Sequence, residues 1–204
     1  MPRLVLASGN PGKLIEMREL LDDVEIQTVS QGELGIPDAE ESGATFIENA
    51  ILKARHAARE SGLPALGEDS GLCVDALQGA PGLYSARYAG DPRNSQANID
   101  KLLDALRDVA GEQRSAHFYC ALVLMRHADD PMPLICEGTW EGRILEARRG
   151  HGGFGYDAVF YDPLMGLSAA EMDPGSKHRV SHRGQALMKL RWAMARGRSA
   201  YALR

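Results

Sequence analysis

Strands and helices alternate along the first half of the chain, and this order restricts the fold more than any other feature of the sequence. Residues 3–7 form a short apolar run typical of a strand, and apolar residues then recur at helical spacing over 14–21. A second strand is expected at 24–29. This strand–helix–strand order, followed by further strands and helices, predicts an α/β fold with helices packed around a mixed β-sheet.

The remaining elements are predicted from the same two periodicities. Thr45 and Glu48 fit a capping box at the start of a helix that Gly62 and Pro64 end. Further expected elements are strands at 72–77, 115–125, 134–145 and 158–161, helices at 99–109 and 185–195, and loops at 31–44, 78–93 and 173–184. We expect a single domain over residues 1–204, because no linker, repeat or low-complexity tract interrupts the chain.

The composition is that of a globular protein without a membrane span or a secretion signal. Of the 204 residues, 44% are hydrophobic and 25% charged, and no apolar run approaches the ~20 residues that a membrane span needs. The net charge of -5 argues against a nucleic-acid partner, although residues 174–204 contain eight Lys or Arg and no acid. The 3 cysteines form no paired motif, so we expect buried, reduced thiols and a cytoplasmic protein.

The loop Ser8-Gly9-Asn10-Pro11-Gly12-Lys13 joins the first strand to the first helix. Glycine allows close backbone approach, and a helix N-terminus offers N–H groups and partial positive charge to a phosphate. Lys13 adds a full charge. The loop is not a Walker A motif, because its glycine spacing is short and Leu14 stands where Ser or Thr would contact magnesium. A simple turn without a ligand is the alternative.

Acidic residues mark a second candidate site. Glu68-Asp69-Ser70-Gly71 lies between two apolar runs, where we expect the chain to leave a sheet, and Glu40-Glu41 lies in the preceding loop. Carboxylates at a strand end are suitable ligands for Mg²⁺, and a further carboxylate is suited to take a proton from an attacking water. The alternative is a solvated acidic turn.

The third candidate site is basic and rich in glycine. Residues 150–157 read Gly-His-Gly-Gly-Phe-Gly-Tyr-Asp, and Lys177 and Ser181-His182-Arg183 follow. Phe154 and Tyr156 are candidates for a wall on which a base stacks, and His182 and Arg183 are candidate donors to carbonyl oxygens. A hairpin loop and a helix capped by Ser181 are the alternative. The other histidines show no zinc spacing.

The chain resembles the inosine/xanthosine triphosphate pyrophosphatase family in six motifs, which occur in the family's order between about Arg3 and Trp192. These motifs are Ser-Gly-Asn-Pro-Gly-Lys (8–13), Glu-Glu-Ser-Gly with Thr-Phe-Ile-Glu-Asn-Ala (40–50), Glu-Asp-Ser-Gly-Leu (68–72), Gly-Ala-Pro-Gly-Leu-Tyr-Ser-Ala-Arg (79–87), Gly-Gly-Phe-Gly-Tyr-Asp (152–157) and Ser-His-Arg-Gly (181–184). The resemblance implies an elongated α/β fold with two lobes around a central nucleotide-binding cleft, and a homodimer.

The resemblance also implies roles for single residues. Mg²⁺ would be held by Glu40, Glu68 and Asp69, with Asp69 also the general base. The substrate would be bound by Ser8, Gly9, Asn10, Pro11, Gly12, Lys13, Lys53, Ser70, Phe154, Gly155, Tyr156, Asp157, Lys177, His182 and Arg183. Ser8 stands where many relatives have Thr, and Glu68 where bacterial relatives usually have Asp. The choice between Glu40 and Glu41 is ambiguous by register.

Together, the residues and the resemblance predict Mg²⁺-dependent hydrolysis of nonstandard purine nucleoside triphosphates. Inosine, deoxyinosine or xanthosine triphosphate would give the monophosphate and pyrophosphate, which keeps these nucleotides out of DNA and RNA. His182, Arg183 or a nearby backbone N–H would donate to the 6-oxygen that adenine lacks. Two alternatives remain open: a pyrophosphatase for modified pyrimidine triphosphates, and a non-catalytic nucleotide- or RNA-binding module.

Overall fold

The chain divides into two compact units. The structure, a computed structural model, describes residues 1–22 and 24–195. Unit 1 comprises Met1–Asp69, Cys120–Gly138 and the chain from Arg183 onward, and unit 2 comprises Ser70–Tyr119 and Thr139–His182. The expected domain over residues 1–204 includes residue 23 and residues 196–204, which lie outside the described residues.

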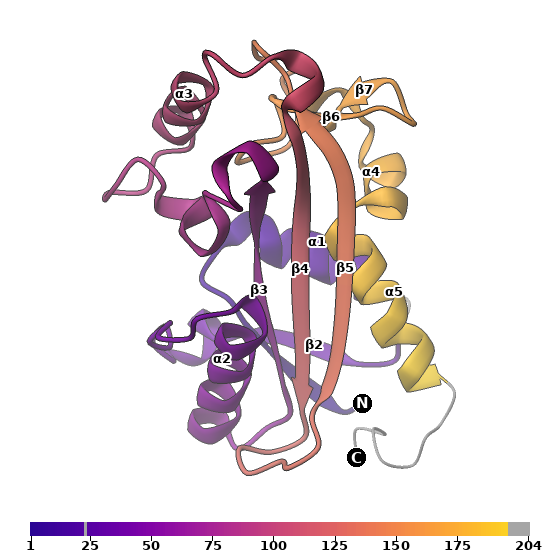
Figure 1. Ribbon diagram of the computed structural model, residues 1–204. Helices are drawn as coiled ribbons and strands as arrows, with labels where there is room; N and C mark the ends of the chain where they lie inside the picture. The colour runs from indigo at the N-terminus through magenta and orange to yellow at the C-terminus, as the bar shows by residue number, and fades with distance from the viewer. Residues whose placement is uncertain (23, 196–204) are drawn as a thin grey trace. The chain divides into compact units, whose positions relative to one another are not determined.

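Seven strands form one mixed β-sheet in the order β2-β1-β3-β4-β5-β6-β7 (Figure 1). The strands are β1 (Arg3–Ala7), β2 (Gln27–Ser30), β3 (Ala65–Val74), β4 (Ser115–Met125), β5 (Leu134–Ile144), β6 (Phe160–Asp162) and β7 (Leu167–Ser168). β1 pairs in parallel with β2 and β3, whereas β6 pairs antiparallel with both β5 and β7. With its flanking helices, this sheet confirms the predicted α/β fold.

Three helices pack on the strands of unit 1: α1 (Pro11–Leu21), α2 (Phe46–Ser61) and α5 (His182–Ala195). Met17 of α1 and Leu187 of α5 share a buried cluster with Leu66 of β3. Ala57 of α2 packs instead in a separate cluster with Ala65. Successive side chains of a strand point to opposite faces. β3 therefore has α1 and α5 on one face and α2 on the other.

Unit 2 contains α3 (Ser95–Ala105) and α4 (Pro174–Val180). Its core gathers Leu72, Leu102, Phe118, Trp140 and Phe160, all with at most 8% of their surface exposed. Short 3₁₀ helices occur in the two units at Gly32–Leu34, Asp75–Leu77, Gly82–Arg87, Gly111–Gln113 and Ala169–Glu171. Over residues 1–22 and 24–195, no helix has the length and apolar character needed to cross a membrane.

The structure differs from the sequence prediction at two places that matter for function. Residues 68–71 are not a turn at a strand end, because they lie inside the ten-residue strand β3. The expected loop at 173–184 contains α4 and the start of α5. Asp173 caps α4 by accepting from the Ser176 N–H, and Pro174 occupies the first turn, a signal of a helix start that the neighbouring Gly175 concealed.

Candidate functional site

Glu68 and Asp69 are neighbours in β3, and their side chains point to opposite faces of the strand. Glu68 shares the Leu66 face and contacts Lys13 of α1 and Arg183 of α5. Asp69 shares the Ala65 face and contacts Lys53 of α2. The structure therefore does not bring the two carboxylates together as one pair.

On the first face, four charged side chains of unit 1 form the Glu68 cluster: Glu16, Glu68, Arg183 and Lys13. Arg183 makes a two-pronged ion pair with Glu68, with Nε 3.0 Å from Oε2 and Nη2 2.9 Å from Oε1. Its Nη1 donates to Glu16, and Lys13 Nζ lies 3.3 Å from Glu68 Oε1. Burial lowers the pKa of Arg183, but Glu68 and Glu16 raise it more, so the net shift is upward. Two carboxylates and two cations leave this cluster neutral.

On the second face, the Asp69 cluster consists of Glu41, Asn49, Lys53 and Asp69. Lys53 Nζ lies 2.8 Å from Asp69 Oδ1 and 2.9 Å from Glu41 Oε1, and it also donates to the Glu68 carbonyl oxygen at 3.2 Å. The Asn49 amide donates to Asp69 Oδ2 at 3.3 Å. Burial lowers the pKa of Lys53, but the two carboxylates raise it above its ordinary value. Two carboxylates and one ammonium give the cluster a net charge of about -1.

The surplus negative charge makes the Asp69 cluster the better place for a divalent cation. Within the described part of the chain, no group of three or more His, Cys, Asp or Glu side chains is placed to hold a metal ion. Mg²⁺ commonly uses one or two carboxylates together with waters and substrate phosphates, so a smaller set is sufficient. Asp69 and Glu41 fit this donor set. Glu68 is already paired with two cations, Lys13 and Arg183. Glu40 is exposed, whereas the adjacent Glu41 is half-buried.

Side chains of the loop at residues 8–13 accept hydrogen bonds from backbone N–H groups of the same segment. Asn10 Oδ1 accepts from the backbone N–H groups of Gly12 and Lys13, and the Asn10 N–H donates to Ser8 Oγ. Pro11 has no N–H group. The expectation that this helix start offers free N–H groups is therefore wrong for Gly12 and Lys13, and phosphate binding by the other groups of residues 8–13 stays a prediction.

In unit 2, Asp157 organises the glycine-rich segment. Its carboxylate accepts from the Phe154 N–H at 2.8 Å and from Lys177 Nζ at 2.7 Å. A Cβ at Gly153 would meet that carboxylate, so a side chain there would displace it. Lys177 Nζ also lies 5.1 Å from the centre of the Phe154 ring, which is 39% exposed. Gly155 has a positive φ of 60°.

Tyr156 corrects one expectation from the sequence. Its ring is only 4% exposed, and its hydroxyl donates to the Ser85 carbonyl oxygen at 2.9 Å. Burial raises the pKa of Tyr156. Tyr156 is therefore part of the core and not a wall for a stacked base. Another predicted site residue, His182, is stacked inside the core: its buried ring lies 4.8 Å from the Phe118 ring, at an interplanar angle of 11°. Ser70 is half-buried in β3.

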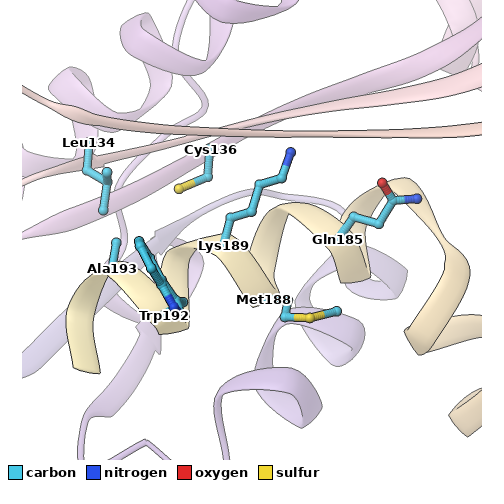
Figure 2. Close-up of a pocket in the computed structure, with 7 residues that line it drawn as sticks. All are labelled: Leu134, Cys136, Gln185, Met188, Lys189, Trp192 and Ala193. Carbon is cyan, nitrogen blue, oxygen red and sulfur yellow. The ribbon is translucent and has the colours of Figure 1, made fainter. Parts of the chain in front are cut away.

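An apolar cavity of about 540 Å³ lies elsewhere in unit 1, between β5 and α5 (Figure 2). It is lined by Leu134, Cys136, Gln185, Met188, Lys189, Trp192 and Ala193. Lys189 donates to the Glu137 carbonyl oxygen, and burial raises the pKa of Cys136 to about 11. None of the lining residues belongs to either charged cluster. The candidate site is therefore defined by the charged clusters and not by this cavity.

Comparison with known proteins shows the family of this chain. A model of the Ham1 family matches residues 4–193, which is nearly all of the described chain. The chain belongs to the Ham1 family. Within this family it is 61% identical over 190 residues to a dITP/XTP pyrophosphatase of Xanthomonas campestris pv. campestris, covering 93% of this chain and 96% of the relative. It is 56% identical to a dITP/XTP pyrophosphatase of Vibrio cholerae, with 93% and 95% of the two chains covered.

Solved structures of the Ham1 family share the fold. A HAM1 protein from Coxiella burnetii superposes with a TM-score of 0.90 at 51% identity, covering 97% of this chain and 100% of the other. The Ham1 protein of Staphylococcus aureus gives a TM-score of 0.83 at 37% identity, with 96% and 98% covered. The family predicted from the six motifs is thus confirmed.

Two members of the charged clusters were not expected from the sequence. Glu16 lies three residues after Lys13 in α1, and Asn49 lies four residues before Lys53 in α2. Both spacings place side chains on the same face of a helix. This periodicity was the available signal, but it does not show which strand residues the shared face meets.

Proposed function

We propose that this Ham1-family chain hydrolyses nonstandard purine nucleoside triphosphates, such as those of deoxyinosine, inosine and xanthosine, to the monophosphate and pyrophosphate. Relatives named dITP/XTP pyrophosphatase at up to 61% identity indicate a nucleoside triphosphate pyrophosphatase, which is a hydrolase. The observation that carries the mechanism is the Asp69 cluster, in which the buried Asp69 carboxylate pairs with Lys53. Such hydrolysis would remove these nucleotides before they enter DNA or RNA.

The roles in unit 1 follow from charge and position. Lys13 and Lys53 neutralise triphosphate oxygens. Asp69 and an acid of the 40–41 pair hold Mg²⁺, which when bound adds positive charge at the phosphates. One Asp69 oxygen faces Lys53, and the other accepts only a long hydrogen bond from Asn49. That second oxygen takes the proton of a water whose oxygen attacks the α-phosphorus, and pyrophosphate leaves with the broken bond.

In unit 2, we assign the nucleoside to the segment around Phe154. The half-exposed Phe154 ring offers a face for a base, while Asp157 and Lys177 fix the backbone beneath it. The proposed donor to the 6-oxygen of hypoxanthine or xanthine is His182, Arg183 or a nearby backbone N–H, and adenine would instead present a donor. The ion pairs of Arg183 with Glu68 and Glu16 hold its guanidinium in a fixed orientation.

The decisive experiment identifies the products. With dITP and Mg²⁺ we expect deoxyinosine monophosphate and pyrophosphate in equal amounts, and much slower hydrolysis of dATP. Release of orthophosphate and the diphosphate would contradict attack at the α-phosphorus. A panel that includes modified pyrimidine triphosphates tests base class, and preferred hydrolysis of a pyrimidine would overturn the purine assignment. We also propose that the protein is a homodimer and that it is cytoplasmic. Light scattering measures its molar mass in solution and so tests the homodimer.

A further inference from the structure

Lys13, the proposed triphosphate contact of α1, is the last member of a series of four ion-paired side chains whose charges alternate. Its ammonium pairs with Glu68 Oε1 at 3.3 Å, which is its one ion pair within the described residues. The Glu68 side chain is 0% exposed and both of its oxygens bind Arg183. Arg183 in turn binds Glu16, so the order is Glu16, Arg183, Glu68 and Lys13.

The two ends of this series of charges, Glu16 and Lys13, both lie in α1. Glu16 follows Lys13 by one helical turn, and the two side chains lie on the same face of the helix. Glu16 is only 9% exposed, although it is an acidic residue on a helix with ample solvent-facing positions. A buried carboxylate is retained when it is paired, and Glu16 pairs with the guanidinium that also binds Glu68.

Glu16 shares the positive charge of Arg183 with Glu68. Because Arg183 is divided between two carboxylates, Glu68 keeps attraction for Lys13 at its Oε1 atom. Without the charge of Glu16, Arg183 would neutralise Glu68 alone, and the hold of Glu68 on Lys13 would weaken. The position of the Lys13 ammonium therefore depends on a side chain that does not touch it.

We propose that Glu16 is a positioning residue, which fixes the phosphate-binding Lys13 through Arg183 and Glu68. This inference rests on the proposed function for the role of Lys13 toward a triphosphate. A change at Glu16 should alter the affinity for the phosphates in the ground state. Asp69 lies on the other face of β3, so we expect no effect on Asp69.

The test uses Glu16→Gln, which keeps the shape and removes the charge. The probe is inorganic tripolyphosphate in metal-free buffer, with binding followed by calorimetry. Positioning predicts that binding weakens by about tenfold, which is the lower end of the loss seen when a residue that orients a metal ligand is removed. Charge alone predicts the opposite sign, because the variant cluster has one negative charge fewer and would bind a polyanion more tightly. Unchanged or tighter binding would overturn the proposal.

A double-mutant cycle tests the route through Lys13. In a Lys13→Met background, Glu16→Gln should have no further effect on tripolyphosphate binding. A full tenfold loss in that background would show that Glu16 acts by another route, and would also overturn the proposal. Glu19→Gln is the matched control, since Glu19 is exposed on the same helix and its change alters net charge equally. It should leave binding unchanged.

Two further readouts separate possible failures. If Glu16→Gln does not fold, Glu16→Asp replaces it in the cycle, because the shorter side chain keeps the charge and should lose only part of the binding. With dITP as substrate, the KM of Glu16→Gln should rise more than its kcat falls. A fall in kcat alone would contradict positioning of Lys13. Absence of dITP hydrolysis by the wild-type chain would instead contradict the proposed function, while the tripolyphosphate cycle would still decide on Glu16.

Discussion

At the scale of single residues, two adjacent acids of β3 face different partners. Glu68 lies in a neutral cluster with Arg183 and Lys13, whereas Asp69 shares Lys53 with Glu41 and retains surplus negative charge. A residue's neighbours determine whether its charge is available for chemistry. This difference is the reason why we propose Asp69, and not Glu68, as the base.

Asp69→Asn tests this assignment. The variant keeps the size of the side chain but cannot take a proton, so we expect kcat for dITP to fall by about 10²–10⁴-fold while the protein stays folded. Asp129→Asn, an exposed acid in the turn between β4 and β5, is the control and should retain full activity. Retention of more than about a tenth of the wild-type rate by Asp69→Asn would mean that another group is the base.

Arg183→Ala should lower the free energy of unfolding by about 3–5 kcal/mol, because it leaves the buried Glu68 and Glu16 carboxylates without their cation. Denaturant unfolding measures the change. Arg59→Ala removes an exposed cation from α2 and should stay within about 0.5 kcal/mol of wild type. A similarly small effect of Arg183→Ala would show that the Glu68 cluster does not support the fold.

The Cys136 thiol should make stability depend on alkaline pH. Burial raises its pKa from 9.0 to about 11 in the folded protein, so folding favours the protonated thiol. This contribution is complete below the unfolded pKa and is lost as the pH rises toward about 11. Wild type should therefore lose more stability over this pH range than Cys136→Ala in chemical unfolding. Parallel curves for the two proteins would contradict the expectation.

At the scale of elements, the approach of α2 to β3 sets the position of Lys53. Gly67 precedes the two acids, and a Cβ there would meet the Ala50 carbonyl oxygen and the Ala54 backbone nitrogen of α2. Only glycine lets the helix backbone come this close to the strand. The distance between Lys53 and Asp69 thus depends on a residue with no side chain.

Gly67→Ala should therefore push α2 away from β3 and lower the free energy of unfolding by about 1–3 kcal/mol. Activity should fall as well, because Lys53 and Asn49 would move relative to Asp69. Gly32→Ala is the matched control: nothing lies within 4 Å of its added Cβ, so stability and turnover should be unchanged. Equal effects of the two substitutions would show that the approach of α2 is not critical.

At the scale of the whole molecule, charge argues for a small substrate and against nucleic acid. The chain has a net charge of -5, and a protein that neutralises many backbone phosphates needs excess Lys and Arg. In residues 177–183, Lys177 and Arg183 are both paired with acids. The basic C-terminal part of the sequence is thus partly neutralised in the fold.

We accordingly expect no binding of single-stranded RNA at physiological ionic strength, measured by gel retardation at micromolar protein. At low salt, only weak retention is expected, because the net charge of -5 repels a polyanion and this repulsion reaches further there, over a Debye length of about 30 Å at 0.01 M ionic strength. Tight, salt-sensitive RNA binding without Mg²⁺-dependent turnover would favour the non-catalytic alternative. The same RNA added to a dITP assay should not inhibit hydrolysis.

The sequence by itself determined the fold class, the family and most of the residues to consider. Periodicity located β1 and β4 at the bounds that the structure shows, and Thr45 and Gly62 marked the two ends of α2. These features are local, since a cap or a period of two or 3.6 residues depends only on neighbours in the chain. The six ordered motifs supplied the rest.

Only the tertiary structure decided how those residues are partnered. Glu68 and Asp69 looked like one acidic pair, but the pleat of β3 places them on opposite faces, with α1 and α5 beside one and α2 beside the other. Tyr156 looked like a stacking wall, but it lies in the core of unit 2. Glu16 is paired with Arg183, which is 167 positions away in the sequence. Charge and burial act through space, so the packing of distant elements determines them.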